Sequence, residues 1–192
     1  MNREESLKCR FNGFWNKKLG TSGQDYYSRM QIADLIDLKV AVSEINNIIT
    51  LRTTFRFIEM LSKNGIISSD EAAEMFKSVD TRSANANGFD VEYESDRIKI
   101  VAEVKCNIPV NKDSFGAAQI SGIAKDIAGL MGGKRKSEKK VADFLKFFVM
   151  LRSSDAVEPA MQKLTDKNQD VVKFIPGMPL DNGHVYVVYV NI

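Results

Sequence analysis

The sequence predicts a mixed α/β protein in which a central sheet of about five strands is flanked by helices. Two observations support this class. Helical spacing of apolar residues dominates the first part of the chain, and strand-like alternation appears in the hairpin region and at the C-terminus. The chain also has 192 residues, 44% of them hydrophobic, which is enough to bury one core. We therefore expect one domain over residues 1–192.

Residues 1–27 are expected to form an arm, or a loop packed on that domain. They are rich in Gly, Asn, Lys and aromatic residues and show turn signals without a sustained period. From Ser28 onward a long amphipathic helix is predicted, running to about Ile49. A second helix is predicted in "TTFRFIEMLSKNG", which ends at a glycine suited to a helix C-terminus.

Ser68 followed by Glu71 is a capping-box pattern and predicts a short helix through "SSDEAAEMFKSV". A helix-turn-helix module that reads DNA is disfavoured, because the second helix begins with Asp70 and Glu71 and continues to Glu74, where a recognition helix needs groups that approach phosphates. We expect a packing helix instead.

The stretch "GFDVEYESDRIKIVAEVKCN", residues 88–107, predicts an antiparallel hairpin with "ESDR" as its turn. After Pro109 we expect a helix capped near Asp113 or Ser114. The apolar face of this helix is expected to carry Ile120, Ile123, Ile127 and Leu130. "DFLKFFVML" predicts a buried strand, "SDAVEPAMQKL" a short helix, and "DVVKFIPG" and "HVYVVYVNI" two closing strands.

Composition limits the chemistry. The net charge of +2 predicts neither a wholly basic nucleic-acid coat nor an acidic protein. Cys9 and Cys106 lie far apart, and His184, the only histidine, sits in a strand pattern, so zinc sites and Ser-His or Cys-His nucleophiles are disfavoured. No run approaches the ~18 apolar residues of a membrane span, and the N-terminus lacks the apolar centre of a signal peptide. A cytoplasmic protein without membrane contact is expected.

The charges in the hairpin are the candidate functional residues. Residues two apart in a strand share a face, so Glu103 and Lys105 should lie on one face with Val101. Strand pairing should bring Asp90 close to both. The other face of the second strand is expected to carry Ile100, Ala102, Val104 and Cys106. In the first strand, Phe89, Val91 and Tyr93 are expected to alternate with Asp90, Glu92 and Glu94.

Two carboxylates and one ammonium on neighbouring strands are typical of a site that binds a hard divalent cation. Such a site can hydrolyse phosphodiesters. The alternative is a solvated sheet face with cross-strand ion pairs. The strongly apolar surroundings "IKIVAEVKCNIP" favour a central strand covered on both faces. The next helix also carries Gln119 at the margin of its apolar stripe, where it can face the same site.

The order helix, strand with Asp, strand with Glu-x-Lys, helix with Gln resembles the PD-(D/E)XK nuclease superfamily. The matching residues are "GFD" at 88–90, "EVK" at 103–105 and Gln119 in "GAAQISG". The resemblance covers Gly88 to about Met131, and Phe89 stands where the family name has proline. It implies a restriction-endonuclease-like three-layer fold.

The resemblance also implies roles for the site residues. Asp90 and Glu103 would be metal ligands, the backbone carbonyl of Val104 would complete the metal shell, and Lys105 would assist the attacking water. Gln119 would lie near the scissile phosphate. Many members carry a further acid on an upstream helix; both Glu44 and Glu59 qualify, Glu44 is slightly favoured, and each is alternatively a solvated helix residue.

The expected function is a DNA endonuclease dependent on Mg²⁺, with Mn²⁺ as an alternative, and a type II restriction enzyme acting on duplex DNA is favoured. Repair or mobile-element nucleases share this chemistry. A homodimer would allow cleavage of both strands. The alternatives are a non-catalytic nucleic-acid-binding or regulatory module with the same fold, and a structural protein with an incidental charged hairpin. Phosphate contacts are expected from "NKK" at 16–18 or from Lys134, Arg135, Lys136, Lys139 and Lys140.

Overall fold

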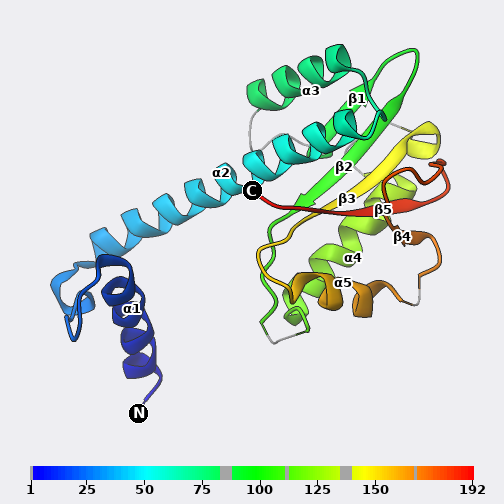
Figure 1. The fold of residues 1–192 in the computed structure, drawn as a ribbon. Coiled ribbons are helices and arrows are strands. Elements are labelled where there is room, and N and C mark those ends of the chain that lie inside the picture. The colour runs from blue at the N-terminus through cyan, green and yellow to red at the C-terminus, as the bar shows by residue number, and fades with distance from the viewer. Residues whose placement is uncertain (1, 83–87, 111–112, 135–139, 167) are drawn as a thin grey trace. The chain divides into compact units, whose positions relative to one another are not determined.

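The computed structural model describes residues 2–192 except 83–87, 111–112, 135–139 and 167 (Figure 1). The chain divides into two compact units, Met1–Ile45 and Asn46–Ile192, which we describe separately. Their boundary falls inside the long helix α2, Ile32–Lys63. The N-terminal segment expected to end near residue 27 is therefore part of a unit that extends to Ile45.

The first unit contains a helix that the sequence pattern did not predict, α1 (Arg3–Leu19). The Asn2 side chain accepts the amide of Glu5 and the Glu5 carboxylate accepts the amide of Asn2, which forms a capping box. Gly20 ends the helix with φ 64°. A 3₁₀ turn, η1 (Tyr27–Arg29), and the start of α2 complete the unit. Its described residues include no buried side chain.

Helix α2 is continuous, although the sequence predicted two helices with a break after Ile49. No glycine or proline stands between the two predicted segments, so nothing interrupts the backbone hydrogen bonds. The hydroxyls of Thr53 and Thr54 donate to the carbonyls of Ile49 and Thr50, at 2.8 and 2.9 Å. The helix backbone therefore satisfies both polar side chains. The predicted glycine end is confirmed, because Gly65 follows the helix with φ 68°.

The second unit is built on a five-stranded mixed sheet, which confirms the predicted α/β class. Its strand order is β1-β2-β3-β5-β4 (Figure 1). The predicted hairpin is confirmed, because β1 pairs antiparallel with β2, while the remaining pairs are parallel. The strands are β1 (Val91–Glu94), β2 (Lys99–Lys105), β3 (Leu145–Leu151), β4 (Val171–Lys173) and β5 (Val185–Val190).

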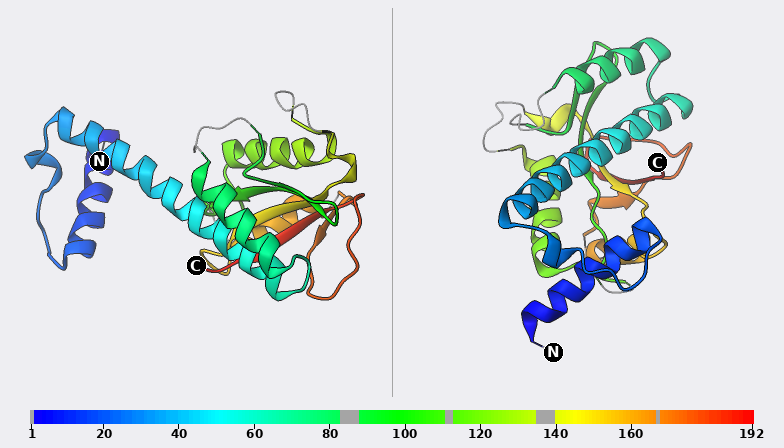
Figure 2. Two further views of the ribbon diagram at one scale, coloured as in Figure 1. Left: turned by 90° about the horizontal axis from the view of Figure 1, so that it is seen from above. Right: turned by 90° about the vertical axis from the view of Figure 1, so that its left-hand side faces the viewer.

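Helices cover both faces of this sheet (Figure 2). On one face, Phe57 and Leu61 of α2 and Met75 of α3 (Ser69–Thr81) pack on the strands. On the other, α4 (Ala117–Gly132) and α5 (Val157–Thr165) pack through Ile123 and Met161, beside the 3₁₀ turn η2 (Val141–Asp143). Each such side chain contributes about 1.5–3 kcal/mol when fully buried. None of the described helices is long and apolar enough to cross a membrane.

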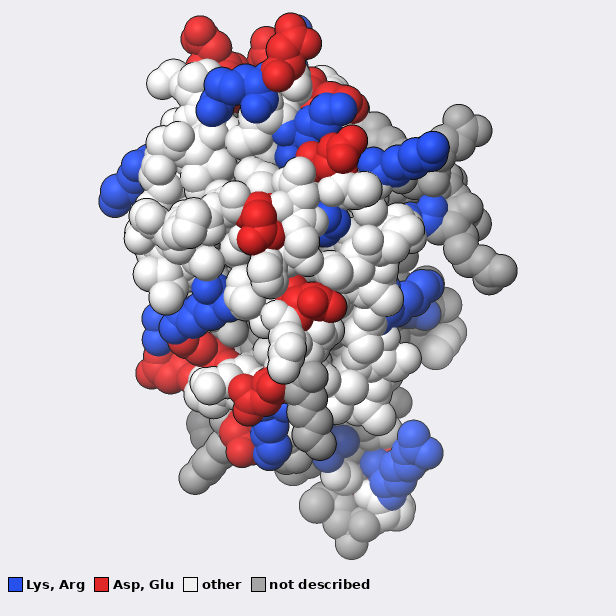
Figure 3. Space-filling model, turned by 90° about the vertical axis from the view of Figure 1, so that its right-hand side faces the viewer, with Lys and Arg blue, Asp and Glu red and all other residues white. Residues whose placement is uncertain are grey.

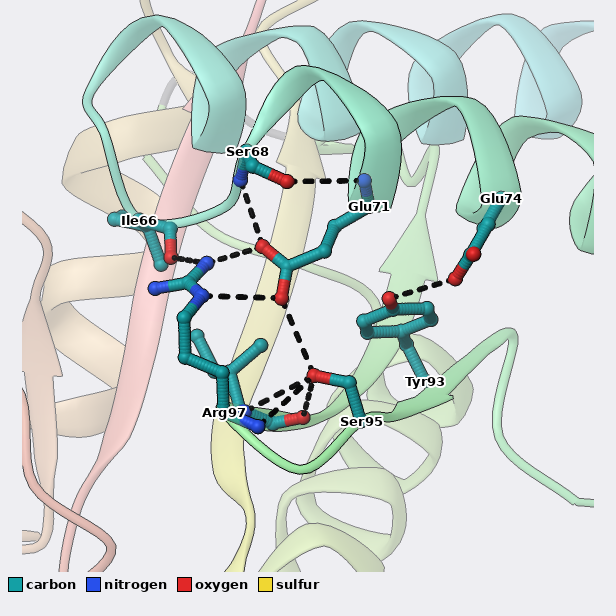
Figure 4. Close-up of polar contacts among 8 residues, drawn as sticks. Ile66, Ser68, Glu71, Glu74, Tyr93, Ser95 and Arg97 are labelled. Carbon is teal, nitrogen blue, oxygen red and sulfur yellow. Dashed lines mark hydrogen bonds and ion pairs between the residues drawn. The ribbon is translucent and has the colours of Figure 1, made fainter.

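The hairpin is tied to α3 by hydrogen bonds at its turn (Figure 4). The predicted capping box of Ser68 and Glu71 is present. The Glu71 carboxylate also accepts hydrogen bonds from the side chains of Arg97 and Ser95 in the hairpin turn. Arg97 donates a further hydrogen bond to the Ile66 carbonyl at 2.9 Å. These contacts fix the strands that carry the candidate site.

Helix α4 begins at Ala117, after the N-cap Gly116, and not near Asp113 or Ser114. The amide of Val110 bonds to the Ser114 carbonyl at 3.0 Å, so Ser114 is held by a contact outside the helix. The predicted apolar face is otherwise correct, since Ile123, Ile127 and Leu130 are buried, although Ile120 is 38% exposed.

Candidate functional site

Asp90 and Glu103 occupy facing positions where the pairing of β1 and β2 ends. The last pair is Val91 with Ala102, so one further step places Asp90 opposite Glu103. The Asp90 carboxylate accepts the amide of Val104 at 2.7 Å. Because the N–H and C=O of a strand residue face the same neighbour, the Val104 carbonyl also faces the Asp90 edge. The three expected oxygen donors therefore lie at one end of the hairpin.

Phe89 does not share a face with Val91 and Tyr93, contrary to the predicted alternation. Phe89 packs in the cluster of α4 and α5, whereas Val91 and Tyr93 pack in the cluster of α2 and α3. The backbone bends at Asp90 before the strand begins, and Gly88 has φ 122°. The strand period therefore starts only at Val91, and the bend leaves Asp90 at the sheet edge.

Glu103 is a buried carboxylate on β2, with a relative exposure of 2%. Burial, together with the charge of Asp90, raises its pKa to about 7 against the opposing effect of Lys134 and Lys105. Its Oε1 contacts the Lys134 ammonium as an ion pair. The same oxygen has no hydrogen bond of acceptable geometry to the described residues. A carboxylate in this state has unused capacity to bind a cation.

Lys105 is held between two acids. Its Nζ lies 2.8 Å from Asp126 Oδ2 on α4 and 3.8 Å from Glu103 Oε2. Burial alone would lower the pKa of Lys105, but the hydrogen bond to Asp126 and the charges of Asp126, Asp90 and Glu103 raise it above its ordinary value. The ammonium is therefore a stable hydrogen-bond donor and not a base at neutral pH.

Lys134 and Asp126 belong to the site but were not assigned to it from the sequence. The prediction that Lys134 contacts DNA stays a prediction; within the chain its ammonium contacts Glu103, donates to the Gly88 carbonyl, and lies 5.0 Å from the centre of the Phe89 ring. Asp126 stands three residues after Ile123 on α4, at the margin of the buried stripe. The spacing argument that singled out Gln119 could therefore have found it.

Gln119 lies at the start of α4 and makes two cap contacts. Its Oε1 accepts the Gly116 amide at 2.9 Å and its Nε2 donates to the Ile108 carbonyl at 3.1 Å. These contacts do not bring it to the carboxylates, and its place near a phosphate stays a prediction. Glu44 is exposed on α2 in the first unit. Glu59 is exposed and pairs with Arg56 at 2.7 Å.

The basic segments are only partly described. Arg135, Lys136 and Lys139 lie outside the described residues, and Lys140 is exposed. Lys17 and Lys18 of the "NKK" segment are in the last turn of α1. On the face shown in Figure 3, basic and acidic side chains of the described residues are interspersed. His184 Nδ1 lies 2.8 Å from Asp181 Oδ1, directly before β5.

The donor set fits a hard cation with few protein ligands. Among the described residues no group of three or more His, Cys, Asp or Glu side chains is placed to hold a metal ion. Mg²⁺ commonly uses one or two carboxylates and keeps several waters, which matches Asp90, Glu103 and the Val104 carbonyl. A cavity of about 270 Å³ borders Asp90 and is also lined by Phe89, Thr50 and Arg82. Glu103, Val104 and Lys105 are not among the residues that line it, so this cavity borders the candidate site only at Asp90.

Comparison with protein-family models, curated proteins and solved structures finds no match for this chain. The family resemblance of Asp90, Glu103 and Lys105 therefore stays a prediction, and the site is interpreted from its geometry.

Proposed function

We propose that this protein is a Mg²⁺-dependent nuclease with a restriction-endonuclease-like three-layer fold, which hydrolyses phosphodiester bonds in DNA. The observation that carries the proposal is the carboxylate of Glu103, 2% exposed, opposite Asp90 and beside Lys105. Two neighbouring acids, one of them buried, are costly unless positive charge compensates them. A divalent cation supplies that charge. A phosphate bound to this cation would contact Lys105, which accounts for a lysine at this position.

Each residue has a distinct role in this proposal. Asp90, Glu103 and the Val104 carbonyl would hold Mg²⁺, or Mn²⁺ in its place. A bound cation of this kind stabilises charge on the phosphate and lowers the pKa of a bound water. Lys105 remains protonated and donates a hydrogen bond to a phosphate oxygen or to the attacking water. Asp126 holds the Lys105 ammonium in place through its 2.8 Å contact.

The substrate class follows from the charges around the carboxylates. Lys105 and Lys134 place two ammonium groups beside Asp90, Glu103 and Asp126, so a phosphate would contact these lysines once a bound cation offsets the three carboxylates. Within this class we propose duplex DNA as the substrate and type II restriction-type cleavage as the reaction.

The test is plasmid cleavage by the purified full chain with Mg²⁺ or Mn²⁺. Lys105→Ala and Glu103→Gln should each reduce the rate by at least about 100-fold, while circular dichroism remains that of the wild type. Lys163→Ala is the matched control, because this lysine is 66% exposed and pairs with Asp113; its rate should be unchanged. Absence of metal-dependent cleavage of DNA and RNA would refute the proposal, as would full activity of Lys105→Ala.

A non-catalytic module with the same fold is the second candidate, and one observation favours it. Lys134 compensates Glu103 and Asp126 compensates Lys105, so the charges of these two pairs are already balanced within the chain. This candidate predicts that the protein binds nucleic acid without cutting it, and that Glu103→Gln leaves the affinity unchanged. The nuclease proposal predicts cleavage, and cation-dependent binding that Glu103→Gln abolishes.

A further inference from the structure

The N-terminal unit exposes apolar side chains of α2 over a large part of the helix surface. Residues 2–45 include no buried side chain, although a stable folded unit normally buries a core. A helix with apolar residues on most sides is usually covered in a larger assembly. The exposed fractions in this part of α2 are Ile32 74%, Ile36 56%, Val40 58%, Val42 49% and Ile45 52%.

One face of this helix has the spacing of a coiled coil. Leu35, Leu38, Val42 and Ile45 follow one another at intervals of three, four and three residues, which are the a and d positions of a heptad. We call these four residues the α2 seam. Leu35 and Leu38 are half-buried, while Val42 and Ile45 are about half exposed. The seam therefore presents exposed apolar surface chiefly at Val42 and Ile45, while Leu35 and Leu38 are partly covered in the single chain.

The charges beside the seam select a partner and an orientation. With Leu35 at position a, Asp34 is at g and Lys39 is at e. In a parallel pair of identical helices, g of one copy faces e of the next heptad in the other, so Asp34 meets Lys39 twice. In an antiparallel pair g faces g and e faces e, so Asp34 and Lys39 cannot pair. This charge complementarity favours a parallel pair of two copies.

We propose that the α2 seam binds the α2 seam of a second copy of this chain in parallel. The seam covers only two heptads, so the dimer is weak and depends on concentration. Additional surface is available on α1, where Leu7 and Phe14 are 51% and 52% exposed. This inference does not depend on the nuclease proposal, because it uses no residue of that site.

The first test is the mass of the full chain by sedimentation velocity between about 1 and 100 µM. The wild type should shift from monomer to dimer with concentration. Val42→Glu with Ile45→Glu should remain monomeric and keep the unfolding transition of residues 46–192, since both side chains are exposed in the single chain. Ser43→Glu is the control, because it adds one such carboxylate at an outer position of the helix, and it should dimerise. A wild type that remains monomeric, or a seam variant that still dimerises, overturns the proposal.

The second test uses the charges. Lys39→Glu places a carboxylate beside Asp34 of the partner subunit and should weaken dimerisation about tenfold. Asp34 also accepts the Gln31 amide at 2.7 Å, so the charge swap Asp34→Lys with Lys39→Glu is compared with Asp34→Lys alone, which loses the same cap. The swap should dimerise more tightly than either single variant. Equal affinities of the three variants would exclude the parallel arrangement.

Discussion

Glu103 places a carboxylate at the buried interface of β2 with α4, where its side chain is 3% exposed. Its charge is compensated by Lys134, which reaches it from the end of α4, and by Lys105 two residues along the strand. A buried pair of this kind contributes little net stability, but removal of one partner leaves the other charge uncompensated. The two residues of the pair should therefore respond differently to substitution.

Lys134→Met should lower the free energy of unfolding by about 2 kcal/mol at pH 8, because it leaves the Glu103 carboxylate buried without its closest cation. Adding Glu103→Gln to Lys134→Met should recover most of this loss, since the buried charge is then gone. Urea unfolding followed by circular dichroism measures both values. If the double variant is as unstable as the single one, Lys134 stabilises the protein through its contact with the Phe89 ring and not through charge.

At the scale of elements, the backbone bend directly before β1 depends on Gly88. This residue has φ 122°, and a Cβ built there would lie 2.5 Å from Glu92 Oε1 and 2.7 Å from Arg82 Nη2. The bend that it allows turns Phe89 toward α4 and leaves Asp90 at the sheet edge. No residue with a side chain adopts this backbone without strain.

Gly88→Ala should therefore destabilise the protein by about 1–3 kcal/mol and should reduce any activity that depends on Asp90. Gly122→Ala is the matched control: it lies inside α4, and its Cβ would meet nothing within 4 Å. The control should stabilise the protein by about 0.5–1 kcal/mol, because alanine favours the helix. Thermal unfolding of the two variants tests whether the shifts have opposite signs, and equal signs would contradict the strain at Gly88.

The hydrogen bonds between Glu71 of α3 and the hairpin turn should weaken in acid. The hydrogen bond from Arg97 is the main cause that lowers the pKa of Glu71 to about 2, and it outweighs the effect of burial; the Ser68 amide and Ser95 hydroxyl add to it. The unfolded chain has the ordinary value of 4.5 and so binds a proton more tightly. The stabilisation is present above about pH 4.5 and is lost as the pH falls toward 2.

Glu71→Gln should lower the free energy of unfolding by about 1–2 kcal/mol at pH 7, a value reduced for the solvent exposure of Arg97. Its stability should also fall less steeply with acid than that of the wild type. Glu59→Gln is the comparison, because its pair with Arg56 is about half exposed and should contribute less than about 0.5 kcal/mol. Denaturant unfolding from pH 7 to 2.5 measures both. If the free energy of unfolding falls in parallel with pH for the wild type and Glu71→Gln, the Glu71 carboxylate does not titrate as expected.

Local patterns predicted the elements with strong signals, such as the capping box at Ser68 and the alternating hairpin. Helix α1 was missed because its interior mixes Asn, Gly and aromatic residues, and only its ends, Asn2 with Glu5 and Gly20, mark it as a helix. The candidate ligands Asp90 and Glu103 were predictable because strand pairing alone brings them together.

The partners of the site residues were harder to predict. Asp126 lies at the margin of the apolar stripe of α4, which helical spacing marks, whereas Lys134 follows the end of that helix and its contact with Glu103 depends on tertiary packing that no local pattern encodes. Gln119 illustrates the same limit. Its position at the margin of the stripe was correct for a polar residue, but the helix starts at Ala117, so its amide is used in the cap.

At the scale of the whole molecule, the two units contain very different amounts of core. The unit from Asn46 to Ile192 has an apolar cluster on each face of its sheet. The described residues of the first unit bury no side chain. Local opening costs little free energy where few apolar contacts must be broken. The first unit should therefore open far more readily than the second.

Hydrogen exchange followed by mass spectrometry should resolve this difference. In dilute protein, amides of α1 and of residues 32–45 should exchange quickly, while those of β2, β3 and β5 exchange slowest, because these strands lie inside the sheet between both clusters. When the protein concentration rises, protection should increase along residues 32–45 and remain constant in the strands, since a second copy stabilises only the segment that it covers. The variant Val42→Glu with Ile45→Glu should not show this increase. Strong protection of residues 32–45 in dilute monomer would mean that this segment is stabilised within one chain, and the exposed seam would then need no partner.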